Sequence, residues 1–230
     1  MKVLICGIKG KMGSAIYNEL SKNPLYEITG FDKKKSKGVK SNLIEALNGV
    51  DIVVDFTNYD ISKKIIKEAL NRKIKVISGT TGFKRDEIDE FYNIALKNLT
   101  SFYWSPNYSK GYNIILDETK RLYQSFDKCD IIEVHSNQKL DKPSGTSVAI
   151  ATTMDFDLEK INSIRLNNAL ALHSIILEDE DERVIITHEI ISRKAFLNGF
   201  INAFRKIIGG DYVRKTIWTR IFKLSNINIK

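Results

Sequence analysis

The sequence predicts an α/β fold, in which an N-terminal doubly wound parallel sheet is followed by a C-terminal α+β domain with a mostly antiparallel sheet. Short apolar runs alternate with helical patterns up to about residue 106, which is typical of parallel strands joined by helices. A glycine-rich turn follows the first of these runs. Beyond residue 107 strands follow one another without regular helices between them, which indicates a second domain.

Composition limits the classes of protein to consider. The 230 residues are 43% hydrophobic with 3 prolines and 13 glycines, as in an ordinary globular protein. No apolar run reaches the roughly 18 residues of a membrane span or forms a signal peptide, so we expect a cytoplasmic protein without a membrane partner. The net charge of +8 suits nucleic acid or small polyanions. Because basic and acidic residues are mixed along the helical patterns, we favour small anions and expect no nucleic-acid partner.

The first strand and helix enclose the glycine-rich turn. Residues 2–7 form an apolar run, and residues 12–22 have helical spacing. Between them lies Gly7-Ile8-Lys9-Gly10-Lys11-Met12-Gly13, a variant of the fingerprint of Rossmann-like dinucleotide-binding folds, in which glycines allow a sharp turn and close approach of a pyrophosphate. An ordinary glycine turn is the alternative interpretation.

The second strand ends at an acidic residue. Residues 26–31 form this strand, and Asp32 follows nineteen residues after Gly13, where an acid can bind the adenosine ribose. Lys33 could bind a 2′-phosphate, so NADH and NADPH both remain open as cofactors. A solvated, lysine-rich loop is the alternative.

Three further strands are predicted at residues 51–56, 74–77 and 101–104, with helices at 60–73 and 84–97. Ligands of such sheets bind beyond the carboxyl ends of the strands. The segments at those ends are Asp55-Phe56-Thr57, Gly79-Thr80-Thr81-Gly82 and Ser105-Pro106-Asn107-Tyr108. Ordinary turn chemistry explains any one of them but explains all three less well.

The second domain contains the residues with the clearest chemistry. We predict a helix at 114–126, strands at 131–134, 161–165, 170–177 and 183–191, and a last helix at 193–208. Within residues 133–146, His135 can exchange a proton near neutral pH and Lys139 is a fixed positive charge. Pro143-Ser144-Gly145-Thr146 is typical of a helix start, whose N–H groups can bind an anion. A negatively charged substrate is therefore expected.

These motifs together resemble the 4-hydroxy-tetrahydrodipicolinate reductase (dihydrodipicolinate reductase) family over about residues 2–208. The segment Glu133-x-His135-x-x-x-Lys139-x-Asp141-x-Pro143-Ser144-Gly145-Thr146 is the most specific part of the resemblance. The resemblance implies NAD(P)H-dependent reduction of 4-hydroxy-tetrahydrodipicolinate, a small dicarboxylate, to tetrahydrodipicolinate in lysine and diaminopimelate biosynthesis. It also implies a cytoplasmic homotetramer built through the sheet of the second domain.

The resemblance assigns roles to particular residues. It implies a dinucleotide-binding domain at 1–106, joined by about 197–230, and a substrate-binding and oligomerisation domain at 107–196. His135 and Lys139 are the implied catalytic residues. The implied cofactor-binding residues are Gly7, Ile8, Lys9, Gly10, Lys11, Met12, Asp32, Lys33, Gly79, Thr80, Thr81, Ser105, Pro106, Asn107 and Tyr108. The implied substrate-binding residues are Ser136, Lys139, Ser144, Gly145 and Thr146.

The chain departs from the family at Ser136, where the family usually has a second histidine, and the tail at 218–230 is divergent. No spacing of histidine, cysteine and carboxylate residues predicts a metal site. Two alternative functions are compatible with the sequence: another two-domain NAD(P)-dependent dehydrogenase, and a non-catalytic NADPH-binding homologue. Oxidation of the reduced cofactor that depends on the cyclic dicarboxylate distinguishes the reductase from both alternatives.

Overall fold

The computed structural model describes residues 1–33 and 38–209. Within these residues the chain forms two compact units, one of Met1–Ser105 with residues 201–209 and one of Pro106–Phe200. The expected return of residues 210–230 to the first domain, and the divergent tail at 218–230, lie outside the described residues.

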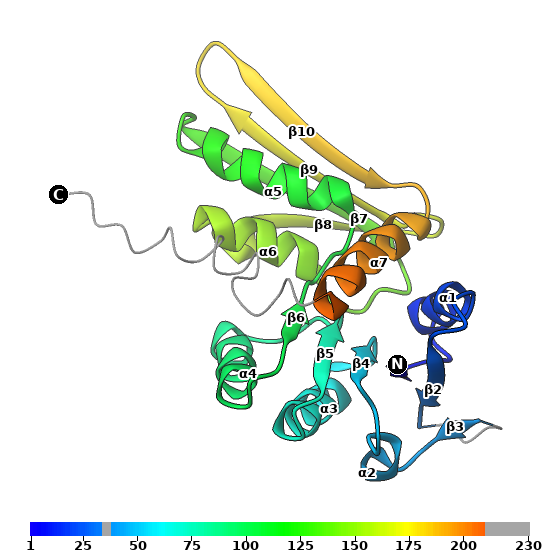
Figure 1. Ribbon diagram of the computed structural model, residues 1–230. Helices are drawn as coiled ribbons and strands as arrows, with labels where there is room; N and C mark the ends of the chain where they lie inside the picture. The colour runs from blue at the N-terminus through cyan, green and yellow to red at the C-terminus, as the bar shows by residue number, and fades with distance from the viewer. Residues whose placement is uncertain (34–37, 210–230) are drawn as a thin grey trace. The chain divides into compact units, whose positions relative to one another are not determined.

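A six-stranded parallel sheet forms the centre of the first unit (Figure 1). Its strands are β1 (Lys2–Cys6), β2 (Glu27–Phe31), β3 (Val39–Lys40), β4 (Ile52–Asp55), β5 (Lys75–Ser78) and β6 (Phe102–Trp104). The strand order β3-β2-β1-β4-β5-β6 reverses direction at β1, which confirms the predicted doubly wound sheet. At this reversal the ends of β1 and β4 lie side by side. This is where such folds bind ligands.

Helices connect these strands. They are α1 (Lys11–Leu20), α2 (Leu43–Ala46), α3 (Tyr59–Asn71) and α4 (Arg85–Lys97). Because the connections are right-handed and run in opposite directions from β1, α1 covers one face and α3 and α4 cover the other. The apolar faces of α1 and α3 are buried at Ile16, Ile65 and Ile66. The short elements β3 and α2 were not predicted, because two or four residues are too few to show a periodicity.

The second unit contains a four-stranded mixed sheet. Its strands are β7 (Lys128–Ser136), β8 (Ile161–Leu166), β9 (Ala171–Glu178) and β10 (Arg183–Ile190), in the order β10-β9-β7-β8. The pairs β10–β9 and β9–β7 are antiparallel, as predicted for most of the sheet. The pair β7–β8 is parallel, because α6 (Gly145–Met154) and the 3₁₀ turn η1 (Leu158–Lys160) connect its strands in a crossover.

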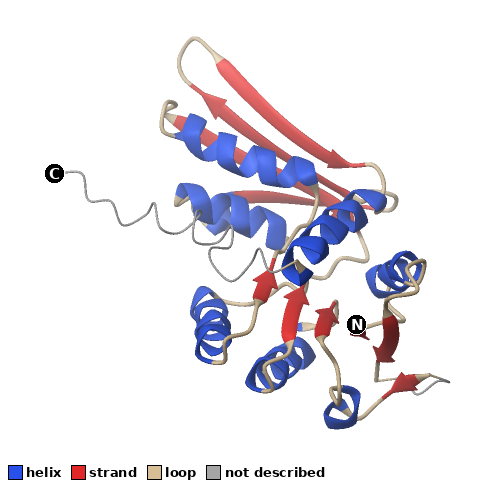
Figure 2. Cartoon of the chain, viewed as in Figure 1, coloured by secondary structure: helices blue, strands red, loops and turns tan. Residues whose placement is uncertain are grey.

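Helices cover one face of this second sheet. Figure 2 shows α5 (Lys110–Tyr123) and α6 beside each other over that face. Alternate residues of β9 are buried, and Ile175 and Leu177 pack in a core with Leu116 and Ile150. The remaining residues of each strand point to the opposite face.

Two boundaries in this unit differ from the prediction and affect the site. The strand β7 extends to Ser136, so His135 lies on the strand rather than in the loop after it. The helix α5 begins at Lys110, four residues early, because the hydroxyl of Ser109 accepts a hydrogen bond from Tyr112 N at 3.2 Å. The last helix, α7, spans Lys194–Ile208. None of the described helices is long and apolar enough to cross a membrane.

Candidate functional site

The glycine turn after β1 is tightly packed and leaves room only for a ligand close to its backbone. Gly7 has a φ of +77°, and a Cβ atom there would clash with the carbonyl oxygen of Phe56. A Cβ on Gly13 would clash with the carbonyl oxygen of Gly7. Gly10 precedes α1 and offers no side chain to cap it, and the first turn of α1 has no acidic residue. The N–H groups of this helix start therefore suit the pyrophosphate of a dinucleotide.

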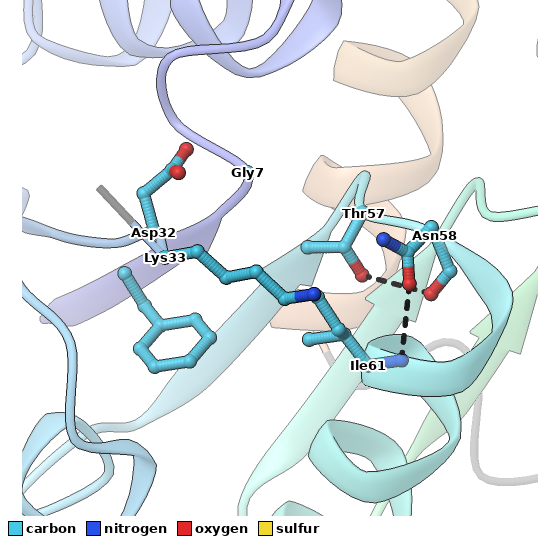
Figure 3. A pocket seen from close by; sticks show the side chains of 7 residues that line it. Gly7, Asp32, Lys33, Thr57, Asn58 and Ile61 are labelled. Atoms are coloured by element: carbon cyan, nitrogen blue, oxygen red, sulfur yellow. Dashed lines mark hydrogen bonds between the residues drawn. The ribbon is translucent and has the colours of Figure 1, made fainter.

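A cavity of about 330 Å³ lies beside this turn, at the ends of β2 and β4 (Figure 3). The carboxylate of Asp32 points toward the turn, and its Oδ2 accepts a long hydrogen bond from Lys9 N at 3.4 Å. Lys33 extends across the cavity toward Asn58 and Ile61. A carboxylate and an ammonium in one cavity can bind a ribose hydroxyl and a phosphate, so the residues present fit the expected dinucleotide.

A buried carboxylate organises the strand ends next to this cavity. Asp55 is fully buried at the end of β4 and accepts hydrogen bonds from the hydroxyls of Thr57 (2.6 Å), Ser78 (2.6 Å), Thr80 (3.0 Å) and Ser62. Trp104 Nε1 also donates to the carbonyl of Thr80 at 2.7 Å. Asp55 therefore holds the loop with Gly79, Thr80 and Thr81 in place. The sequence indicated hydroxyl groups at this edge but not that one carboxylate gathers them.

The segment Ser105–Tyr108 follows β6, and its residues are divided between the two compact units. Ser105 is the last residue of the first unit, and Pro106 begins the second. Within the second unit, Asn107 Nδ2 donates to Thr146 Oγ1 at 3.3 Å, and Asn107 Oδ1 accepts from Ser109 N at 2.9 Å. Tyr108 is buried against the ring of Phe200. Asn107 thus contacts a residue that was predicted to bind substrate.

His135 lies at the centre of a buried polar cluster in the second unit. Its Nδ1 is 2.9 Å from Glu133 Oε2, which is an ion-pair distance. Glu133 is fully buried and also accepts hydrogen bonds from Arg165 Nη2 (2.9 Å), Ser144 N (3.2 Å) and Ser147 Oγ (3.1 Å). Burial alone would raise the pKa of Glu133, but the contacts from His135, Ser144 and Arg165 outweigh it and hold this pKa well below its usual range.

A second imidazole lies against His135 and is kept neutral. The rings of His135 and His173 are 5.1 Å apart in an edge-to-face arrangement, and His173 Nε2 is 3.3 Å from Ser144 Oγ. Burial, followed by the charge of His135, lowers the pKa of His173 to about 3. The His173 side chain is fully buried.

The loop after β7 carries Lys139, and its position depends on two neighbours. Lys139 Nζ is 2.8 Å from Asp141 Oδ2, and Lys139 N donates to the carbonyl of Ser136 at 3.0 Å. Strand alternation places Ser136 on the face of β7 opposite to His135, and its hydroxyl accepts from Gln138 N at 3.3 Å. The structure therefore does not bring the Ser136 side chain into the His135 cluster.

The three predicted substrate-binding residues at the start of α6, Ser144, Gly145 and Thr146, differ in their contacts. Ser144 caps the helix, since its hydroxyl accepts from Ser147 N at 3.2 Å, and only 1% of Ser144 is exposed. Its polar atoms are therefore used within the protein. No described residue accepts a hydrogen bond from the N–H of Gly145 or Thr146. These two N–H groups can bind a carboxylate.

The cluster combines an imidazole, an ammonium and free backbone N–H groups, which can bind an anion and donate a proton to it. Glu133, His135 and His173 also bring ligand-type atoms within 4.8 Å of one another. Because Arg165 already supplies a positive charge to Glu133, we assign no metal there. No sequence pattern indicated Arg165, which lies 32 residues from Glu133 along the chain.

Comparison with known proteins supports the same interpretation. The family models for the N-terminus and the C-terminus of dihydrodipicolinate reductase match residues 1–108 and 111–221. The chain is 27% identical to a 4-hydroxy-tetrahydrodipicolinate reductase of Dictyoglomus turgidum, over 90% of this chain and 93% of that protein. It is 29% identical to the one of Caldanaerobacter subterraneus subsp. tengcongensis, over 91% and 93%.

Among solved structures, a dipicolinate-bound dihydrodipicolinate reductase from Paenisporosarcina sp. TG-14 has the same fold, with a TM-score of 0.73 and 22% identity over 91% of this chain and 95% of that chain. The two family models together cover nearly the whole sequence, and they meet where the chain passes from one compact unit to the other. The chain therefore belongs to the dihydrodipicolinate reductase family.

Proposed function

We propose that this chain reduces 4-hydroxy-tetrahydrodipicolinate to tetrahydrodipicolinate with NADH or NADPH, in lysine and diaminopimelate biosynthesis. Membership of the family supports this assignment. The structural observation that carries it is the His135 cluster, in which Glu133 contacts both the proton donor His135 and the backbone N–H of Ser144 at the start of α6. Reduction of a dicarboxylate needs both groups: backbone N–H groups bind its negative charge, and an acid donates a proton during the reaction.

The first unit binds the cofactor in this proposal. When bound, NADH or NADPH supplies a hydride. Asp32 accepts hydrogen bonds from the ribose, and Lys33 binds a 2′-phosphate when the cofactor is NADPH. The pyrophosphate is bound by Gly7, Ile8, Lys9, Gly10, Lys11 and Met12. The residues assigned to the nicotinamide end are Gly79, Thr80 and Thr81, followed by Ser105, Pro106, Asn107 and Tyr108. Rigid support of Thr80 by Asp55 is consistent with this role.

The second unit binds the substrate and supplies the proton. Lys139 and the N–H groups of Gly145 and Thr146 bind the carboxylates, and Ser144 holds the helix start that presents these groups. The substrate loses its hydroxyl group as water, a hydride adds to the ring, and His135 donates the proton that completes the reduction. We assign Ser136 to the backbone turn that positions Lys139, because its carbonyl accepts from Lys139 N.

An assay with freshly generated substrate and each cofactor in turn tests the proposed function. We expect substrate-dependent loss of reduced-cofactor absorbance with at least one of NADH and NADPH. Binding of NADPH without such a loss would instead identify a non-catalytic homologue. Oxidation that requires a different amino acid or semialdehyde would identify another two-domain dehydrogenase.

We further propose a cytoplasmic homotetramer that assembles through the open face of the sheet in the second unit. This face carries the exposed apolar side chains of Ile164, Leu166 and Ile185. Ile185→Lys should lower the mass measured by light scattering, because it places a charge in the interface. Ile114→Lys on α5 is the matched control, since Ile114 is similarly exposed and should leave the mass unchanged. Cell fractionation tests the location.

A further inference from the structure

We propose that Arg165 and Glu133 form one positioning device, which sets the orientation and tautomer of His135 and links it to the loop that carries Lys139. This inference rests on the proposed function, because it concerns the proton donor of that reaction. Neither residue is a reacting group: Glu133 is fully buried, and Arg165 binds it from the neighbouring strand. Both act through other side chains.

The contacts of Glu133 favour one orientation of the His135 ring. Its Oε2 faces Nδ1 of His135 at 2.9 Å. Its Oε1 accepts from Arg165 Nη2 at 2.9 Å and from Ser144 N at 3.2 Å, which prevents the carboxylate from rotating. An anionic carboxylate beside Nδ1 favours a proton on that nitrogen. Nε2 is then the atom that transfers a proton to a ligand.

Arg165 extends this support to the Lys139 loop. The same Nη2 atom that donates to Glu133 also donates to the carbonyl of Asp141 at 2.6 Å. Asp141 pairs through its carboxylate with Lys139. One guanidinium group therefore contacts both the carboxylate behind the proton donor and the backbone of the loop with the second functional residue. Arg165 is held in turn by its Nη1 contact to the Ile164 carbonyl at 2.9 Å.

The other charged and titratable groups around His135 do not make the contacts that Glu133 and Arg165 make. His173 on β9 is neutral and uses Nε2 on Ser144, and His188 lies opposite it on β10. Lys139 and Asp141 neutralise each other in the loop. Among the described residues, Glu133 is thus the carboxylate in contact with the His135 ring.

The first test replaces Glu133 by glutamine, which keeps the shape of the side chain and removes its charge. We expect kcat to fall about tenfold to a hundredfold while the Kd for NADPH is unchanged.

The second test separates the two links made by Arg165. Arg165→Gln should lower kcat and raise KM for the dicarboxylate, since it frees both Glu133 and the Lys139 loop. Arg165→Lys keeps the positive charge, but a lysine ammonium group lacks the planar guanidinium that contacts both Glu133 and the Asp141 carbonyl. This variant should therefore restore kcat more fully than it restores KM. Glu118→Gln is the control, because Glu118 pairs with Arg121 on the exposed side of α5 and should leave both constants unchanged.

A measurement without turnover keeps the inference testable if the chain lacks the proposed activity. The protein contains three histidines, so NMR of nitrogen-15-labelled histidine resolves few imidazoles. We expect neutral His135 to carry its proton on Nδ1 in the wild type and to become a tautomer mixture in Glu133→Gln. An unchanged tautomer in that variant would overturn the inference. Absence of turnover in the wild type would count against the proposed function alone.

Discussion

His135 shows how the surroundings of one side chain are set by residues of more than one strand. Its exposed fraction is 6%, and its ring lies between Glu133 and His173. In the same cluster Ser144 uses its hydroxyl as a helix cap, although its position in the sequence suggested contact with a ligand. At this scale the residue type indicates the possible chemistry, and the neighbours select which part of it is used.

Replacement of His135 by glutamine should lower kcat about a hundredfold to ten-thousandfold, because the amide cannot donate a proton as a general acid does. The Kd for NADPH should stay the same, since the residues that we assign to the cofactor are elsewhere. Steady-state kinetics and a fluorescence titration measure the two quantities. Near-normal turnover would remove His135 from the mechanism.

Replacement of Lys139 by alanine should cost about 1.5 to 3 kcal/mol of interaction with the dicarboxylate, which is the usual range for a hydrogen bond to a charged group. This loss should be seen in kcat/KM at saturating NADPH. Lys142→Ala is the matched control, because Lys142 is an exposed lysine of the same loop. Equal effects of the two variants would show that Lys139 contributes only to the general charge of the loop.

At the scale of elements, strand ends and helix starts carry most of the site. The turn after β1 needs glycine at position 7 for two separate reasons, its positive φ and its contact with Phe56. Gly49 shares the first feature only, with a φ of +71° and no atom within 4 Å of the position of a Cβ. Alanine substitutions at Gly7 and Gly49 therefore separate the effect of backbone strain from the effect of close packing.

We expect Gly7→Ala to lower the free energy of unfolding by roughly 1–3 kcal/mol or more and to weaken NADPH binding at least tenfold. Gly49→Ala should cost about 1–2 kcal/mol through backbone strain and leave NADPH affinity unchanged. Urea unfolding and calorimetric titration measure these effects. Normal NADPH affinity in Gly7→Ala would contradict the assignment of this turn to the pyrophosphate.

Long periodic elements could be predicted from the sequence, and short or capped ones could not. The helix α7 begins within one residue of its predicted start, because its apolar spacing is regular over fifteen residues. The helix α5 begins earlier than predicted, since its first turn has few apolar residues and its start depends on the Ser109 cap. The end of β7 was placed too early, because His135 and Ser136 are polar residues in a strand that has neighbours on both sides.

At the scale of the whole molecule, the buried histidine couples stability to pH. His173 has a folded-state pKa of about 3, while in the unfolded chain it would titrate near 6.5. Between these values the unfolded state binds a proton that the folded state does not. The free energy of unfolding should therefore fall as the pH decreases below about 6.5. The groups that face His173 are His135, Glu133, His188 and Lys139.

Replacement of His173 by glutamine should reduce this pH dependence by up to roughly 1.4 kcal/mol per pH unit, the value for one proton. The relevant range is from pH 6.5 down to about 4.5, below which Glu133 also begins to contribute. Urea unfolding followed by circular dichroism at several pH values tests this. An identical slope in both proteins would mean that His173 is protonated in the folded state.

The fold class and the family could be predicted from the sequence alone, and the same patterns predicted the residues of a candidate site. Alternation of apolar runs and helices, the glycine spacing and the motif from Glu133 to Thr146 are local patterns, so one chain without a structure reveals them. The contacts among these residues become visible only in the folded chain. Arg165 contacts Glu133 from another strand, Asp55 accepts hydrogen bonds from hydroxyls of the two loops that carry Thr57 and Thr80, and Ser136 points away from His135. Such contacts depend on strand register, which the sequence of either strand alone does not specify.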